Sequence, residues 1–311
     1  MNKKIVGLGN AVLDIMTTVD DGFINKNNLS KGTMQIVDIK TSEKTLEQIS
    51  IVNTDSGGSV ANTISTVSML GAQASFCGKV MDDKLGKDFE NKMKESGANF
   101  LCKKSTSGLP TARCLVFVTP DGERTMQTFL GASTTLNSSD IKEEYFKDNE
   151  FLLVEGYLWS SDTARQAVAK AISFCKSNSK IIFSLSDPTL AKSFKEDFIS
   201  FIKKDVDILI GNEIEFQELL DTNFDKKKIS EFLNLDIAVI TRGDKGADFI
   251  VSDTMVTVPG CEISNVIDTT GAGDMFAAGF IFKYMQGSSP QESIEFANKL
   301  AALIIQKYGA R

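Results

Sequence analysis

The segment Asp268-Thr269-Thr270-Gly271-Ala272-Gly273-Asp274-Met275-Phe276 decides how this chain is interpreted, because a glycine turn runs directly into a helix with a carboxylate in its first turn. Gly271 and Gly273 let the backbone close around a small anion, and the N–H groups at the helix start point toward it. Asp274 beside them is placed to accept the proton of an attacking hydroxyl. The pattern favours phosphoryl transfer. The helix dipole alone also favours an acidic first turn, so the rest of the chain must decide.

Length, composition and charge limit the class of protein. The 311 residues are 42% hydrophobic and 24% charged, which suits one large domain or one domain with an appendage. No run approaches the roughly 18 apolar residues of a membrane span. The net charge is −7 and the longest basic cluster is Lys226-Lys227-Lys228, so we expect a small-molecule substrate and neither nucleic acid nor a membrane as partner.

Histidine is absent from the sequence, and this excludes Ser-His-Asp triads and nearly all zinc hydrolase designs. A general base must then be a carboxylate or a lysine. The five cysteines form no close pair in the sequence, which suits reduced thiols and a cytoplasmic location.

Apolar strand-like runs alternate with helical patterns along most of the chain. The runs are 5–9, 74–78, 151–155, 180–185, 208–210 and 237–241. This alternation predicts a three-layer α/β/α sandwich with a mainly parallel central sheet.

Two stretches, 15–39 and 110–130, break this rhythm and read as extra strands. We expect them to form a small β-sheet lid over a catalytic core made of 1–14, 40–109 and 131–311. Exposed lid strands could pair two chains into a homodimer, and a monomer is equally compatible.

Several segments carry candidate binding groups. Asp14, at the end of the first strand, is suited to accept hydrogen bonds from a vicinal diol, although a turn-closing aspartate explains it as well. Gly57-Gly58-Ser59 opens a helix that carries Asn62 one turn later, which suits contacts with substrate hydroxyls and is partly explained by capping. The start Gly7-Leu8-Gly9 lacks the third glycine of a dinucleotide fingerprint, so a Rossmann-type oxidoreductase is disfavoured.

The later strand ends carry a second set of candidates. Asn212 and Glu215 follow a buried strand and could hold magnesium through water, or simply begin a solvated helix. Thr241, Gly243 and Gly246 suit contacts with nucleotide phosphates, although a plain loop explains them nearly as well. The lid segment 110–130 contains Arg113 and Arg124, which could bring a cation to the phosphates, with surface ion pairing as the alternative for Arg113.

Taken together and in this order, these segments resemble the ribokinase (PfkB-type) family of carbohydrate and nucleoside kinases. The resemblance spans nearly the whole chain. It rests on five motifs, at 57–62, 71–86, 212–215, 241–243 and 268–274.

The resemblance implies ATP and Mg²⁺ as cofactors. It implies Asp274 as the base, with Gly271, Ala272 and Gly273 as the anion hole. The substrate would contact Asp14, Gly57, Gly58, Ser59 and Asn62. Asn212 and Glu215 would organise magnesium and phosphate. ATP would lie near Thr241, Gly243, Gly246 and, at its adenine, Asn298. Many members bind a monovalent cation such as K⁺ beside the anion hole, and Asp268, Thr270 and Gly309 would be nearest to it.

Within the family the chain looks most similar to adenosine kinases. On that comparison Asn10, Gln35 and Leu130 would line a nucleoside pocket, and Arg124 would reach the phosphates. Thr270 and Thr189 depart from the adenosine kinase pattern, and sugar kinases tolerate both residues. The substrate therefore stays open between adenosine, at its 5′-hydroxyl, and a sugar such as ribose, fructose or ketodeoxygluconate. A non-catalytic nucleoside or sugar sensor on the same scaffold is the further alternative.

Overall fold

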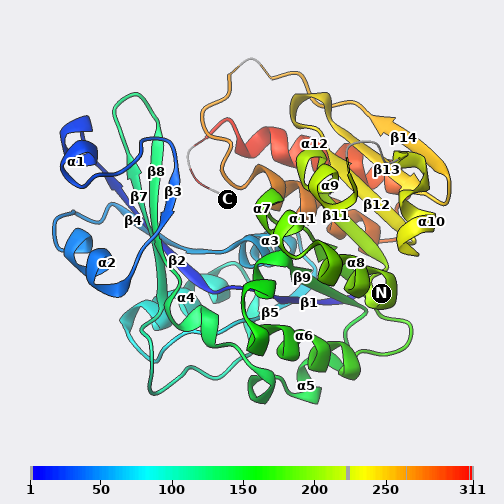
Figure 1. The fold of residues 1–311 in the computed structure, drawn as a ribbon, viewed down its shortest axis with the longest axis horizontal. Coiled ribbons are helices and arrows are strands. Elements are labelled where there is room, and N and C mark those ends of the chain that lie inside the picture. The colour runs from blue at the N-terminus through cyan, green and yellow to red at the C-terminus, as the bar shows by residue number, and fades with distance from the viewer. Residues whose placement is uncertain (1–2, 222–224, 264, 308, 310–311) are drawn as a thin grey trace.

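A large, mainly parallel sheet forms the centre of the molecule in the computed structural model, which describes residues 3–221, 225–263, 265–307 and 309 (Figure 1). Its strand order is β14-β13-β12-β11-β10-β9-β1-β5-β6. All neighbours from β12 to β6 are parallel, and the β13–β14 hairpin adds an antiparallel edge. The strands are β1 (Lys4–Leu8), β5 (Gln73–Cys77), β6 (Asn99–Phe100), β9 (Phe151–Glu155), β10 (Lys180–Ser184), β11 (Ile208–Asn212), β12 (Ile237–Thr241), β13 (Ala247–Val251) and β14 (Thr254–Val258).

Helices cover both faces of this sheet, because its strands are apolar on both sides. Phe151 and Leu153 of β9 pack in one core with α3 and α11, whereas Leu152 and Val154 pack in a second core with α6 and α8. The first face carries α3 (Ser59–Met69), α4 (Lys84–Glu95), α11 (Ala272–Met285) and α12 (Pro290–Ile304). The second carries α5 (Glu143–Phe146), α6 (Asp162–Phe174), α7 (Pro188–Ser193), α8 (Lys195–Asp205), α9 (Glu213–Leu220) and α10 (Ile229–Leu233). The predicted three-layer sandwich is confirmed.

Short 3₁₀ helices complete the chain. They are η1 (Gly131–Thr135), η2 (Ser138–Asp140), η3 (Gly156–Ser160), η4 (Lys226–Lys228) and η5 (Gly243–Lys245). None of the helices in the described ranges has the length and apolar character that a membrane span requires.

A second, smaller sheet stands beside the large one, with the order β3-β8-β7-β2-β4 (Figure 1). Its strands are β2 (Val12–Thr18), β3 (Met34–Ile36), β4 (Asn53–Gly57), β7 (Ala112–Val118) and β8 (Arg124–Phe129). The sheet therefore extends beyond the two segments expected for a lid, since β2 begins at Val12 and β4 also belongs to it. The polar sequence of β4 carries no apolar strand pattern, and β4 is an edge strand that pairs only with β2 among the described strands.

Two helices in the smaller unit were not foreseen, α1 (Asp21–Lys26) and α2 (Ile39–Leu46). Each begins at an aspartate whose side chain accepts a backbone hydrogen bond, Asp20 from Phe23 N and Asp38 from Thr41 N. Both pack on the sheet face that is turned away from Asp14 and Cys114. Phe23, for example, contacts Phe117 of β7.

The helices α11 and α12 pack at very close range where they cross. A Cβ atom added to Gly279 of α11 would lie 2.8 Å from the Cα of Ala297 in α12. Only glycine therefore fits here without moving one helix, and α11 is the helix that carries Asp274.

We expect Gly279→Ala to destabilise the protein by about 1 kcal/mol, because overpacking costs more than the gain in helix propensity. Gly22→Ala in the exposed helix α1 is the matched control, and the same change there should be neutral or stabilising. Urea unfolding of both variants measures the difference. Equal stabilisation by the two changes would contradict the close packing.

Candidate active site

Asp274 lies in the first turn of α11 and its carboxylate is held by two side chains of α3. Ser59 Oγ donates to Asp274 Oδ1 at 2.7 Å, and Asn62 Nδ2 donates to Asp274 Oδ2 at 2.9 Å. Gly271, the residue before the helix, has a φ of +75°. This left-handed turn suits glycine and aims the first helical N–H groups outward. The structure thus brings together the two glycine-rich segments that the sequence singled out separately.

The side chain of Asn62 has one hydrogen-bond acceptor that no described group uses. Its amide nitrogen is bonded to Asp274, so the orientation of the amide is fixed. Its oxygen Oδ1 is buried and has no hydrogen-bond partner among the described groups. An unpaired buried acceptor costs free energy, and a ligand hydroxyl bound there would remove this cost.

Two adjoining cavities lie beside the start of α11, and Asp274 lines the smaller one. The larger has a volume of about 400 Å³, the smaller about 100 Å³, and Thr241 and Gly273 line both. Asp274, Ser59, Asn212 and Glu215 line the smaller cavity. Because Gly273 lines both cavities and precedes Asp274, a ligand in the larger cavity would lie close to Asp274.

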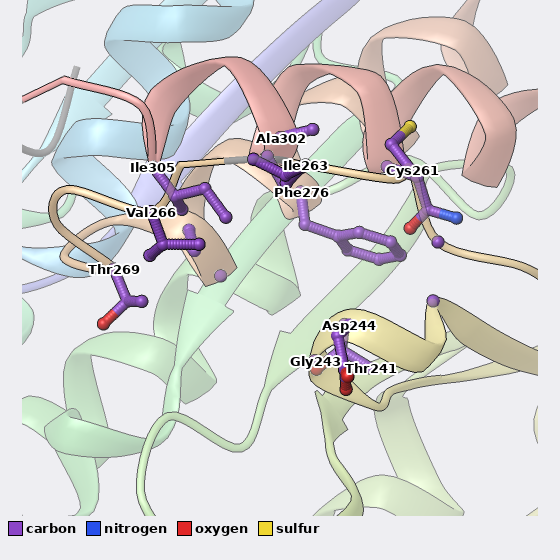
Figure 2. A pocket seen from close by; sticks show the side chains of 16 residues that line it. Thr241, Gly243, Asp244, Cys261, Ile263, Val266, Thr269, Phe276, Ala302 and Ile305 are labelled. Carbon is purple, nitrogen blue, oxygen red and sulfur yellow. The ribbon is translucent and has the colours of Figure 1, made fainter.

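The larger cavity has one apolar side and one glycine-rich side. Figure 2 shows Val266, Phe276 and Ile305 around α11 and α12, opposite the turn that carries Thr241 and Gly243. The predicted residues Gly246, Ala272 and Asn298 also line this cavity, and Asn298 Nδ2 donates to Pro259 O at 2.9 Å. The size and lining suit a flat organic group with a polar tail. Sequence reasoning missed the apolar residues of this wall, because nothing distinguishes them from core residues.

Asn212 and Glu215 form a capping box at the start of α9. Glu215 N donates to Asn212 Oδ1, and the two carboxylate oxygens of Glu215 accept hydrogen bonds from the backbone and side-chain nitrogens of Asn212. Burial raises the pKa of Glu215 to about 7, although the hydrogen bond from the backbone of Asn212 lowers it. No group of three or more acidic, cysteine or histidine residues gathers as a metal cage in the described ranges. Magnesium bound here would take most ligands from phosphate and water, as Mg²⁺ commonly does.

Asp14, Gly57, Gly58 and Asn10 meet where the chain crosses between the two sheets. The carboxylate of Asp14 lies over Gly57, in the space that a Cβ would fill. Gly58 has a φ of +98° and packs against the carbonyl oxygen of Asn10. Both glycines are needed for close approach, and they place Asp14 next to the start of α3.

Glu155 is a buried carboxylate that sequence reasoning missed. It lies at the end of β9, is fully buried, and accepts hydrogen bonds from Asn10 N at 2.7 Å and Val60 N at 3.0 Å. Burial raises its pKa to about 7 and outweighs these two hydrogen bonds. The available signal was a glutamate that ends an apolar strand at the sheet edge where ligands gather.

Ser184 and Ser186 also line the smaller cavity and were not foreseen as site residues. Ser186 has a φ of +71°, which is uncommon for a residue with a side chain. Its hydroxyl accepts a hydrogen bond from Gly156 N at 2.9 Å. Backbone strain of this kind concentrates at functional sites.

Several predicted residues line neither cavity, and Gln35 and Leu130 are among them. Gln35 pairs in register with Gln127 and so lies on the sheet face opposite Asp14, and its amide donates to Ser30 Oγ at 3.4 Å. Leu130 follows β8 and precedes η1.

Arg124 of β8 forms a buried ion pair with Asp268, which lies just before the glycine turn. Asp268 Oδ2 also accepts a hydrogen bond from Gly309 N at 3.0 Å, and Oδ1 accepts one from Thr270 N at 2.9 Å. Burial by itself raises the pKa of Asp268, but the hydrogen bonds from Gly309 and Thr270 and the charge of Arg124 together hold it below its ordinary value. Asp268 is therefore an ionised carboxylate that accepts hydrogen bonds on both oxygens.

Comparison with known proteins gives a consistent picture. A family model described as pfkB family carbohydrate kinase matches residues 25–311. A 5-dehydro-2-deoxygluconokinase from Halalkalibacterium halodurans is 26% identical over 270 residues, which cover 82% of this chain and 80% of the relative.

Solved structures match the whole chain. An adenosine kinase from Sinorhizobium meliloti has a TM-score of 0.88 and 32% identity, covering 100% of this chain and 96% of that chain. A "probable sugar kinase protein" from Rhizobium etli CFN 42 has a TM-score of 0.87 and 31% identity, covering 100% and 95%.

The raised pKa of Glu155 gives a pH-dependent stability. Glu155 titrates at about 7 when folded and near 4.5 in its ordinary state, so its contribution is complete below about 4.5 and is lost as the pH rises to about 7. We expect the unfolding free energy of the wild type to fall relative to Glu155→Gln by up to about 3 kcal/mol over this window. Urea unfolding at several pH values measures it. Glu196→Gln, at an exposed glutamate, is the control, and its unfolding free energy should depend on pH as that of the wild type does. If Glu155→Gln also shows the wild-type pH dependence, burial does not raise the pKa of Glu155.

Proposed function

The chain belongs to the pfkB family of carbohydrate kinases and is an ATP-dependent phosphotransferase, and on this premise we propose that it phosphorylates the 5′-hydroxyl of a ribose-type substrate, with adenosine as the first candidate. The observation that carries the proposal is the position of Asp274 in the wall of the smaller cavity, held by Ser59 and Asn62, directly after Gly273, which lines both cavities. The larger cavity suits the phosphoryl donor and the smaller region the reacting groups.

Asp274 is proposed as the general base. It takes the proton of the acceptor hydroxyl as that oxygen forms its bond to the γ-phosphorus and the bond from this phosphorus to the bridging oxygen of ATP breaks. Ser59 and Asn62 hold the carboxylate in one orientation, so little reorganisation is needed at the moment of transfer. Asp14 and the free Oδ1 of Asn62 are proposed to bind other substrate hydroxyls.

The turn of Gly271, Ala272 and Gly273 is proposed to stabilise the transferring group. The N–H groups at the start of α11 have no partners within the helix, and they favour negative charge in front of them. When bound, magnesium would neutralise charge on the phosphate oxygens. Asn212 and Glu215 are the nearest polar residues of the smaller cavity that could orient its water ligands.

The donor nucleotide is proposed to lie in the larger cavity. Its apolar side, with Phe276, would contact the adenine together with Asn298, and Thr241, Gly243 and Gly246 would lie along the phosphates. Arg124 has a buried Nε without a partner among the described groups, which gives it one N–H for a phosphate oxygen.

The second sheet supports a nucleoside as the acceptor. The strand register puts Met34, Ile36 and Met126 on the same face as Asp14. Met34 is 49% exposed and Ile36 is 64% exposed. An uncovered apolar face beside a diol-binding carboxylate suits a base attached to a ribose, and a free sugar has no group that would use it. We propose that this sheet closes over the substrate as a lid and excludes water.

A sugar acid is the second candidate acceptor. The 5-dehydro-2-deoxygluconokinase relative acts, by its name, on such a compound. The same Asp274 arrangement would serve its hydroxyl, so the site chemistry does not separate the two candidates, and the apolar sheet face favours the nucleoside.

We expect Asp274→Asn to lower kcat by roughly 10²–10⁴, because base catalysis contributes about that much, while substrate KM changes little. Steady-state kinetics with coupled detection of ADP measures this. Asp253→Asn, at an exposed aspartate of the β13–β14 turn, is the matched control and should keep full activity. An Asp274→Asn enzyme with near-normal kcat would remove the proposed base.

A panel of acceptors tests the substrate. We expect kcat/KM for adenosine to exceed that for ribose, fructose and 5-dehydro-2-deoxygluconate by at least about tenfold, since the base adds apolar contact area. Met34→Asp should lower kcat/KM for adenosine and leave that for ribose unchanged. A higher kcat/KM for the sugar acid would replace adenosine by that class. Absence of ADP formation with every acceptor tested would favour the non-catalytic sensor.

A further inference from the structure

The structure points to Arg124 as the occupant of the place that a monovalent cation would take beside the anion hole, so we infer that phosphoryl transfer by this chain does not depend on K⁺ or Na⁺. The inference rests on the proposed kinase function. It concerns Asp268, the one carboxylate among the residues that the sequence resemblance assigned to such a cation. The chain's own guanidinium, and not a bound ion, would then supply the positive charge there.

The hydrogen bonds of Asp268 leave little room for an ion. Oδ1 accepts Thr270 N, while Oδ2 accepts both Gly309 N and the guanidinium of Arg124. Every one of these groups is a donor that presents positive hydrogen toward the carboxylate. A cation needs oxygen lone pairs, and it is repelled by hydrogens that already point at them. Asp268 and its described neighbours therefore do not fit a monovalent cation site.

The charge balance supports the same reading. The side chains of Arg124 and Asp268 are only 8% and 5% exposed. A buried carboxylate is stable only with a compensating charge, and Arg124 provides one. In the protein without nucleotide, a second positive charge at this place would have no further carboxylate partner among the described groups that bond Asp268.

The ion pair is connected directly to the catalytic turn. Asp268 bonds Thr270 N, and Thr270 immediately precedes Gly271, whose left-handed backbone starts α11. Asp268 thus fixes the loop that presents the anion hole, and Arg124 fixes Asp268. Because Arg124 comes from β8 of the second sheet, it also ties that sheet to the turn.

Arg113 provides an internal control for Arg124. It lies on β7 of the same sheet, is 4% exposed, and points to the opposite face, where its Nε donates to Ser42 Oγ at 2.7 Å and its guanidinium lies over Phe129. Substitution of Arg113 therefore removes a buried arginine from the same sheet and leaves the hydrogen bonds of Asp268 in place.

The first test uses the wild-type enzyme. Turnover is measured in tetramethylammonium chloride and after replacement by KCl or NaCl at constant ionic strength, with all reagents free of K⁺ and Na⁺. We expect kcat to change by less than about threefold, which is below the gain expected from filling an empty charge site. Activation by K⁺ beyond that factor overturns the inference and leaves the kinase function standing. Absence of phosphorylation with any acceptor in any salt is a failure of the proposed function instead.

The second test uses variants and a readout other than activity. The thermal unfolding midpoint of the wild type should be equal in KCl and tetramethylammonium chloride. Arg124→Met frees Asp268, so KCl should raise its midpoint and restore part of its lost turnover, whereas Arg124→Lys and Arg113→Met should show no K⁺ response. A wild-type midpoint that rises in KCl would show that the ion binds with Arg124 in place. If Arg124→Met does not fold, the wild-type and Arg124→Lys measurements decide the question alone.

Discussion

Two hydrogen bonds from α3 to the carboxylate of Asp274 are the constraint on which the site depends. They join helices far apart in the sequence and make the start of α3 and the start of α11 a single unit. The start of α11 presents backbone N–H groups, and the start of α3 presents Asn62 and lies next to Asp14 of β2. The larger and the smaller cavity then share Gly273 and Thr241, because the start of α11 lies beside the carboxyl ends of β11 and β12.

The junction between the two sheets is held by charged groups that no local pattern reveals. Glu155 accepts hydrogen bonds from the backbone at Asn10 and at Val60, which lie on two different connections between the sheets. Arg124 and Asp268 bind the second sheet to the loop before α11. Both groups are buried, so their placement is costly to change. The second sheet is thereby held near the catalytic turn at two separate points.

The sequence was sufficient for the layers and for the centre of the site, because both depend on local patterns. Alternating apolar runs gave the strands of the large sheet, and glycines before a helix marked both Gly58 and Gly271. The strand β4 could not be predicted from its polar residues, since an edge strand needs no apolar pattern. Glu155 and the partner of Arg124 also escaped, because a single charged residue does not indicate which distant residue it contacts. Side chains alternate along β3, and its register with β8 decides that Met34 and Ile36, and not Gln35, lie on the face of Asp14. A three-residue strand carries no sequence signal for this register.

The position of β1 in the middle of the large sheet has a consequence for how the chain reaches its native state. During translation β1 leaves the ribosome early, yet its neighbour β9 is synthesised only after the whole of the second sheet. The central strand therefore cannot gain its second neighbour until residues 151–155 have been made, and its pairing depends on contacts distant in sequence. Asp274 is made later still, so its hydrogen bonds with Ser59 and Asn62 form only after α11 has emerged from the ribosome.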